Sequence, residues 1–231
     1  MPVWPAGLPP ASGKRYPGGM KPLAECKLYA FVDTGYLHGR APEMVAALLC
    51  EGGADLIQLR AKDQPVTAVR RMAERMLPVT HAAGVGLVIN DHLEIAHEIG
   101  AEFCHLGQED FFDAGHRHIS ELGTRNSELK IGLSTHAPAQ AERAVAAGAD
   151  YVAIGPIYAT GTKPTARPVT LEYVRWAAAS VRVPWFAIGG ITLQNLDEVL
   201  AAGARRVCVV SAILNAPDVT KACRAFRQRL D

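Results

Sequence analysis

The chain has 231 residues, a formal net charge of +1 and 49% hydrophobic residues. That hydrophobic share excludes a wholly disordered chain, and the near-neutral charge offers no basic surface that would indicate a nucleic-acid partner. No apolar run is long enough to span a membrane, and the N-terminus lacks the apolar segment of a secretory signal. Five cysteines form an odd set without a CxxC pair. We therefore expect a cytoplasmic protein without a disulfide framework.

Residues 1–26 differ from the rest of the chain because they are rich in proline and glycine. Such a composition is typical of a flexible extension. We therefore expect one catalytic domain over residues 27–231, preceded by this extension.

Two patterns alternate from residue 27 onward. Short apolar runs typical of buried strands begin at residues 27, 55, 86, 102, 130, 151, 183 and 206. Amphipathic stretches with helical periodicity lie between them, among them 42–53, 66–84, 138–148 and 192–203, and Thr192 is the expected N-cap of the last. This alternation predicts an α/β fold with parallel strands. Eight units favour a TIM (β/α)8 barrel over an open, doubly wound sheet.

The second strand carries the clearest polar pattern. Gln58, Arg60 and Lys62 alternate at its end, so they share one face, which we expect to point toward the barrel axis. The other face, with Ala61, would pack against the outer helices. Two cations beside an amide indicate an anionic ligand such as phosphate, and a solvated strand end is the alternative.

Acidic and amide side chains end the third and fourth strands, namely Asn90 and Asp91, then Gln108 and Asp110. Neighbouring parallel strands lie about 4.8 Å apart, so the two carboxylates could approach one point. Beside a cationic cluster, such a pair favours Mg²⁺ bound together with substrate phosphates. Capping of the following helices is an equally good reading of these acids.

The later strand ends and one loop supply the other candidates: Ser134, His136, Thr160, Gly161, Thr162, Lys163, Gly189, Gly190, Val210 and Ser211. The loop 160–163 offers hydroxyls, backbone N–H groups and an ammonium, which suit a phosphate or pyrophosphate. Glycines after the seventh strand let the backbone approach an anion, and phosphate sites after strands seven and eight are common in these barrels. A histidine after a strand can act as a base, a ligand or a cap.

Together these motifs resemble the thiamin phosphate synthase family. The matching strings, in the family's order, are QLRAK at 58–62, VINDHLEIA at 88–96, HLGQED at 105–110, GLSTH at 132–136, ADYVAIGPIYATGTK at 149–163, AIGGI at 187–191 and VVSAI at 209–213. The series is specific, whereas any one of the strings alone would not be.

The resemblance implies a transferase that joins a hydroxymethylpyrimidine pyrophosphate to a thiazole phosphate, with Mg²⁺ as cofactor. By this analogy Asp91 and Asp110 hold the metal. The remaining implied roles are charge neutralisation by Arg60, Lys62 and Lys163, orientation of the pyrimidine by Gln58, Asn90 and Ser134, and binding of the thiazole phosphate by Thr160, Thr162, Gly190, Val210 and Ser211. Gln108, His136, Gly161 and Gly189 complete the expected substrate-binding set. The family often has Glu where this chain has Ala61, a change we expect to be tolerated because this side chain points away from the polar face.

Two other functions compete with this one. A thiazole tautomerase on the same barrel would need no metal and would use His136 to shuttle a proton. A non-catalytic protein could bind thiamin precursors through the glycine-rich phosphate site alone. Asp91 and Asp110 argue against both. The expected partners are small-molecule substrates, and a homo-oligomer is compatible with the sequence.

Overall fold

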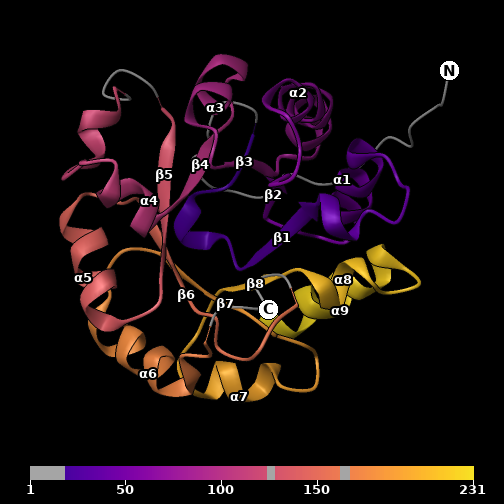
Figure 1. The fold of residues 1–231 in the computed structure, drawn as a ribbon. Helices are drawn as coiled ribbons and strands as arrows, with labels where there is room; N and C mark the ends of the chain where they lie inside the picture. Colours follow the sequence, from indigo (N-terminus) through magenta and orange to yellow (C-terminus); the bar gives the residue numbers. More distant parts are fainter. Residues whose placement is uncertain (1–18, 124–127, 162–166) are drawn as a thin grey trace, which may run out of the picture.

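The computed structural model describes residues 19–123, 128–161 and 167–231. Within them, eight parallel strands form a closed barrel in chain order, and β8 pairs with β1 (Figure 1). The strands are β1 (Leu28–Asp33), β2 (Leu56–Arg60), β3 (Gly86–Asn90), β4 (Phe103–Gly107), β5 (Lys130–Thr135), β6 (Tyr151–Ile154), β7 (Trp185–Ile188) and β8 (Val207–Val209). Each lies inside one of the eight predicted runs, so the predicted TIM barrel is confirmed.

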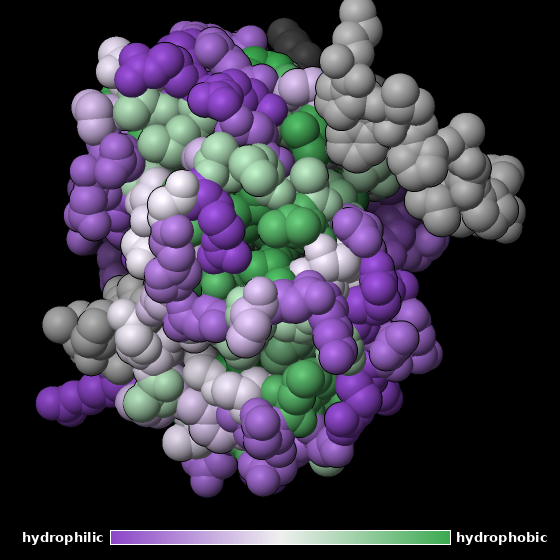
Figure 2. Space-filling view, turned by 90° about the vertical axis from the view of Figure 1, so that its right-hand side faces the viewer, coloured by the Kyte–Doolittle hydropathy of each residue, from purple (hydrophilic) through white to green (hydrophobic). Residues whose placement is uncertain are grey.

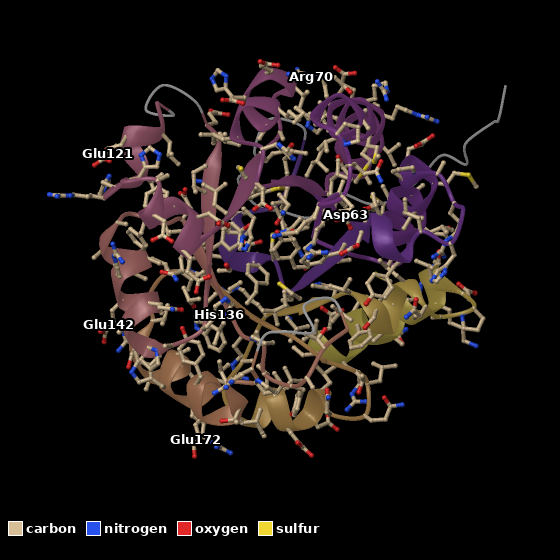
Figure 3. The ribbon with its side chains drawn as sticks, in the orientation of Figure 1. Asp63, Arg70, Glu121, His136, Glu142 and Glu172 are labelled. Carbon is tan, nitrogen blue, oxygen red and sulfur yellow. The ribbon has the colours of Figure 1, made fainter. Side chains whose placement is uncertain are left out.

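Helices surround the barrel on all sides. They are α1 (Pro42–Glu51), α2 (Val66–Ala83), α3 (Leu93–Ile99), α4 (Gln108–Asp113), α5 (Pro138–Ala146), α6 (Thr170–Ser180), α7 (Leu196–Ala201), α8 (Ser211–Leu214) and α9 (Val219–Leu230), with 3-10 turns at Leu23–Glu25, Thr34–Tyr36 and Ile119–Leu122. Charged side chains such as Arg70, Glu142 and Glu172 lie at the outer rim (Figure 3). Hydrophilic residues cover much of the face in Figure 2. None of the helices in the described ranges is long and apolar enough to cross a membrane.

Strand alternation divides the core into two clusters. Outward-facing side chains such as Ile57 and Leu59 pack against the helices in a large outer cluster, to which Ala61 also belongs. Inward-facing side chains, including Tyr29 and Tyr151, fill the barrel itself. The predicted orientation of Ala61 is therefore confirmed.

Residues 20–26, which the sequence places in the extension, pack onto the barrel. Met20 is 1% exposed and joins the inner cluster together with Leu23 and Cys26. Lys21 also forms an ion pair with Asp55. Residues 20–26 thus belong to the packed body, because their apolar side chains cover the end of the barrel opposite the pocket described below.

The start of α7 differs from the prediction that Thr192 caps it. The helix begins at Leu196, and Asn195 occupies the N-cap position. The Asn195 side chain accepts a hydrogen bond from the Thr192 backbone N–H at 2.8 Å and donates one to the Gly190 carbonyl at 2.9 Å. A turn therefore occupies residues 192–195, and its asparagine ties the helix start to the end of β7.

We expect Met20→Ala to lower the free energy of unfolding by about 2–5 kcal/mol, because it leaves a cavity in the inner cluster. Urea denaturation measures the effect. Met44→Ala is the matched control, since Met44 is 61% exposed and should change stability by less than about 0.5 kcal/mol. Equal midpoints for the two variants would show that residues 20–26 do not belong to the barrel.

Candidate active site

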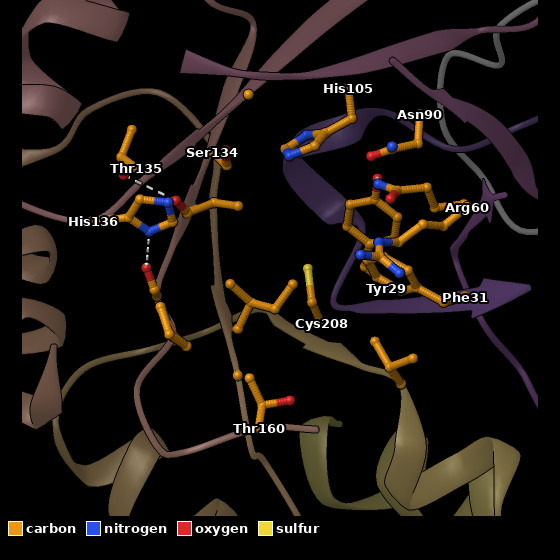
Figure 4. A pocket seen from close by; sticks show the side chains of 18 of the residues that line it. Tyr29, Phe31, Arg60, Asn90, His105, Ser134, Thr135, His136, Thr160 and Cys208 are labelled. Carbon is orange, nitrogen blue, oxygen red and sulfur yellow. Dashed lines mark hydrogen bonds between the residues drawn. The ribbon is translucent and has the colours of Figure 1, made fainter. Parts of the chain in front are cut away.

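One pocket opens at the carboxyl ends of the strands. It is lined by residues of all eight strands or of the segments that follow them, among them Gln58, Arg60, Lys62, Asn90, Asp91, Asp110, Ser134, His136, Thr160, Gly189, Gly190, Val210 and Ser211. Figure 4 shows Arg60 and Asn90 on one side of this pocket and His136 on the other. Most of the predicted site residues are therefore brought together.

The polar face of β2 points into the pocket as predicted. Gln58, Arg60 and Lys62 all line it, while Ile57 and Leu59 face the outer cluster. Each cation is paired with a carboxylate. Arg60 Nη1 lies 2.7 Å from an Asp33 oxygen, and the Lys62 ammonium lies 3.5 Å from Asp91.

Asp91 and Asp110 both line the pocket, and neither caps a helix. The N-cap positions of α3 and α4 are His92 and Gly107, and neither end has a side-chain cap hydrogen bond. Asp91 adopts a left-handed backbone, φ 64°, which an aspartate tolerates. Its carboxylate accepts a hydrogen bond from the Asn90 side chain at 2.6 Å. The capping alternative from the sequence is thus not supported.

Asp110 turns back toward the end of β4. A Cβ added to Gly107 would lie 2.4 Å from Asp110 Oδ2, closer than any real contact. A side chain at this position would therefore push the Asp110 carboxylate away from its place beside the strand end. The GQED string therefore contains both the acid, Asp110, and the glycine that leaves space for its carboxylate, Gly107.

Two of the predicted residues that the structure describes do not line the pocket, Gln108 and Gly161. Gln108 is buried, because α4 begins there directly after β4, so that it is Glu109 and Asp110 of this turn that line the pocket. Gly161 is described but does not line the pocket. Thr162 and Lys163 lie outside the described residues.

Hydrogen bonds from the backbone and from the ring of His136 hold it at the end of β5. Its backbone N–H donates to the Gln140 side chain at 2.7 Å. Its ring Nδ1 lies 2.5 Å from the Gly155 carbonyl, at the cis Gly155–Pro156 peptide. Since a carbonyl only accepts, Nδ1 carries the proton.

The glycine pair after β7 forms a further wall. Gly189 and Gly190 both have positive φ, 102° and 64°, which β-carbon-bearing residues rarely adopt. A Cβ on Gly190 would lie 2.7 Å from the Ala159 carbonyl oxygen. Asn195 holds the Gly190 carbonyl from the far side. The backbone here thus lines the pocket together with Val210 and Ser211, which follow β8.

The pocket floor was not predicted from the sequence. A hydrogen-bonded row crosses the barrel from Gln58 Nε2 to Tyr29 OH at 2.5 Å, from Tyr29 OH to Tyr151 OH at 3.2 Å, and from Tyr151 OH to His105 Nδ1 at 3.2 Å. Tyr29, Phe31, His105 and Cys208 also line the pocket. Strand alternation could have indicated Tyr29 and His105, which share the inward face of their strands.

This floor carries no charge near neutral pH. Burial, with a smaller contribution from Lys62, lowers the pKa of His105 to about 4. Burial also raises the pKa values of Tyr29 and Tyr151 well above their usual range. The pocket thus combines a charged wall at β2–β4 with a neutral, largely aromatic floor.

The fold and pocket define a TIM-barrel enzyme acting on anionic small molecules. A family model described as thiamine monophosphate synthase matches residues 28–213. The thiamine-phosphate synthase of Thermus thermophilus is 47% identical over 78% of this chain and 84% of its own. That of Acidothermus cellulolyticus is 41% identical over 90% and 96%. The solved thiamine phosphate pyrophosphorylase from Pyrococcus furiosus has a TM-score of 0.79 and 30% identity, over 90% of this chain and 96% of that one.

This chain belongs to the thiamine monophosphate synthase family. The resemblance drawn from its motifs is confirmed.

We expect Gly107→Ala to lower synthase activity about 100-fold, because the new methyl group displaces the Asp110 carboxylate. The backbone of Gly107, φ −64° and ψ 130°, suits alanine, so the fold should persist. Steady-state kinetics and circular dichroism measure both effects. In an Asp110→Ala background, Gly107→Ala should cause no further loss of synthase activity. Full activity in Gly107→Ala would contradict the proposed crowding.

Proposed function

We propose that this protein is a thiamin phosphate synthase, a transferase that condenses 4-amino-5-hydroxymethyl-2-methylpyrimidine pyrophosphate with a thiazole phosphate. The products are thiamin phosphate and pyrophosphate. The observation that carries this proposal is the joining, in one pocket, of Arg60 and Lys62 with Asp91 and Asp110 above a neutral floor.

In the proposed reaction, the bond between the pyrimidine methylene carbon and the pyrophosphate oxygen breaks, and its electron pair leaves with the pyrophosphate. The lone pair of the thiazole nitrogen then forms the new carbon–nitrogen bond. Neither step needs a protein nucleophile. Stabilisation of the departing negative charge and close positioning of the two substrates supply the catalysis.

Arg60 and Lys62 stabilise the leaving pyrophosphate, together with Lys163, whose role rests on the family motif. Gln58, Asn90 and Ser134 orient the pyrimidine. The neutral state of His105 suits this chemistry, because a protonated imidazole in the floor would repel the pyrimidine cation.

Mg²⁺ is the proposed cofactor, and Asp91 and Asp110 are the residues that would hold it. Two carboxylates that line one pocket, one of them given room by Gly107, fit a hard cation that also takes substrate oxygens. The described ranges contain no group of three or more His, Cys, Asp and Glu side chains that could form a metal cage, so oxygens of the substrate would complete the coordination. Bound there, the ion supplies positive charge to the leaving group.

The opposite wall suits the thiazole phosphate. Gly189, Gly190, Val210 and Ser211 line it, and Thr160 adds a hydroxyl. Reducing surroundings fit the five free thiols, which supports a cytoplasmic location. The tautomerase alternative is not favoured, since it leaves Asp91 and Asp110 without a role.

The test is formation of thiamin phosphate and pyrophosphate from both substrates, with Mg²⁺ and then with excess chelator. We expect metal-dependent turnover. Asp91→Ala and Asp110→Ala should each lower kcat by about 10²–10³, a typical cost for losing one preorganised charge contact.

Asp113→Ala is the matched control, because Asp113 lies on the exposed face of the same helix as Asp110. It should retain wild-type turnover. Full activity in both pocket variants would overturn the metal assignment, and no product under either condition would overturn the proposed function.

A further inference from the structure

A buried carboxylate at the end of β1 has no part in the chemistry above. Asp33 is 3% exposed, and its side chain lies beside the pocket without lining it. A carboxylate this buried needs strong partners, because transfer of an unpaired charge out of water is costly.

Asp33 has two partners, one for each oxygen. Its Oδ1 accepts a hydrogen bond from the Gly35 backbone N–H at 2.9 Å. Its Oδ2 accepts one from Arg60 Nη1 at 2.7 Å. The first bond fixes the carboxylate to the backbone turn that follows β1. The second bond then fixes the position of the Arg60 guanidinium relative to that turn.

The barrel register reinforces this arrangement. Asp33 and Arg60 are direct Cα partners across the β1–β2 pair, so the acid stands beside the base of the arginine side chain. The Arg60 side chain is 20% exposed, against 50% for that of Lys62. Of the two cations in this wall, Arg60 is therefore the one with a buried, directional anchor.

We propose that Asp33 is a positioning residue that aims the Arg60 guanidinium at the leaving pyrophosphate. This inference rests on the proposed function. Arginine recognises phosphate oxygens through a planar fork of N–H donors, so the plane of the group matters as well as its charge. Without Asp33, the long side chain could turn to the carboxylates that also line the pocket, Asp91 and Asp110.

The proposal predicts that a change at Asp33 affects the kinetics of one substrate and not of the other. Asp33→Asn keeps the size of the side chain and an acceptor for Gly35, but it removes the charge that orients Arg60. We expect kcat/KM for the pyrimidine pyrophosphate to fall about 10- to 100-fold, the scale of a small misplacement of a charged group. The KM for the thiazole phosphate should stay unchanged. A purely structural role would raise both KM values.

A double-mutant cycle tests whether Asp33 acts through Arg60. Arg60→Gln should cost about 10²–10³ in kcat/KM, and Asp33→Asn should add little in that background. If the double variant lost kcat/KM by the product of the two single losses, the proposal would be overturned. Asp63→Asn is the control. It removes an exposed acid shortly after β2, the strand that carries Arg60, and should leave activity unchanged.

Calorimetric titration with pyrophosphate and Mg²⁺ separates this inference from the proposed function. We expect the affinity to fall about tenfold in Asp33→Asn, and also in Asp33→Glu, which keeps the charge but moves the carboxylate by one methylene group. Wild-type affinity in both variants would overturn the positioning role. Wild-type protein that binds pyrophosphate but makes no thiamin phosphate would overturn the proposed function alone.

Discussion

Closure of the parallel barrel is the constraint on which the site depends. Because all strands run in one direction and each is paired on both sides, their polar ends meet at one rim. The register then sets which of them are neighbours. Asp33 stands beside Arg60, Asn90 beside His105, and Gly107 beside Ser134. Short segments far apart in the sequence thus form one wall.

Charged and uncharged side chains occupy different parts of the pocket. The β2–β4 wall places two cations and three carboxylates where an anionic leaving group would lie, whereas the tyrosines and His105 below it stay uncharged. The wall at Gly189 and Gly190 presents backbone instead of side chains. This division suits a reaction in which negative charge departs in one direction and a neutral nucleophile approaches from another.

The sequence predicted the barrel because strands and amphipathic stretches alternate without interruption, and it predicted the face of β2 because polar and apolar residues alternate there. The strand β1 is apolar apart from Tyr29 and Asp33, so no polar pattern drew attention to its inward face and both residues were missed. Gln108 was predicted to bind substrate but is buried outside the pocket wall, because α4 starts directly after β4. Met20 was assigned to the extension because an average composition does not reveal a single buried side chain. Thr192 is not the N-cap of α7, because the Asn195 side chain bonds the Thr192 backbone N–H and the helix begins only after Asn195.

Diffraction from crystals grown with pyrophosphate and Mn²⁺, an anomalous scatterer that takes the same oxygen ligands as Mg²⁺, tests the site most directly. The expected result is one metal peak bound by Asp91 and Asp110, with the pyrophosphate between it and Arg60. A metal held elsewhere, or pyrophosphate seated on the Gly189–Gly190 wall instead, would contradict the assignment of the two halves of the pocket.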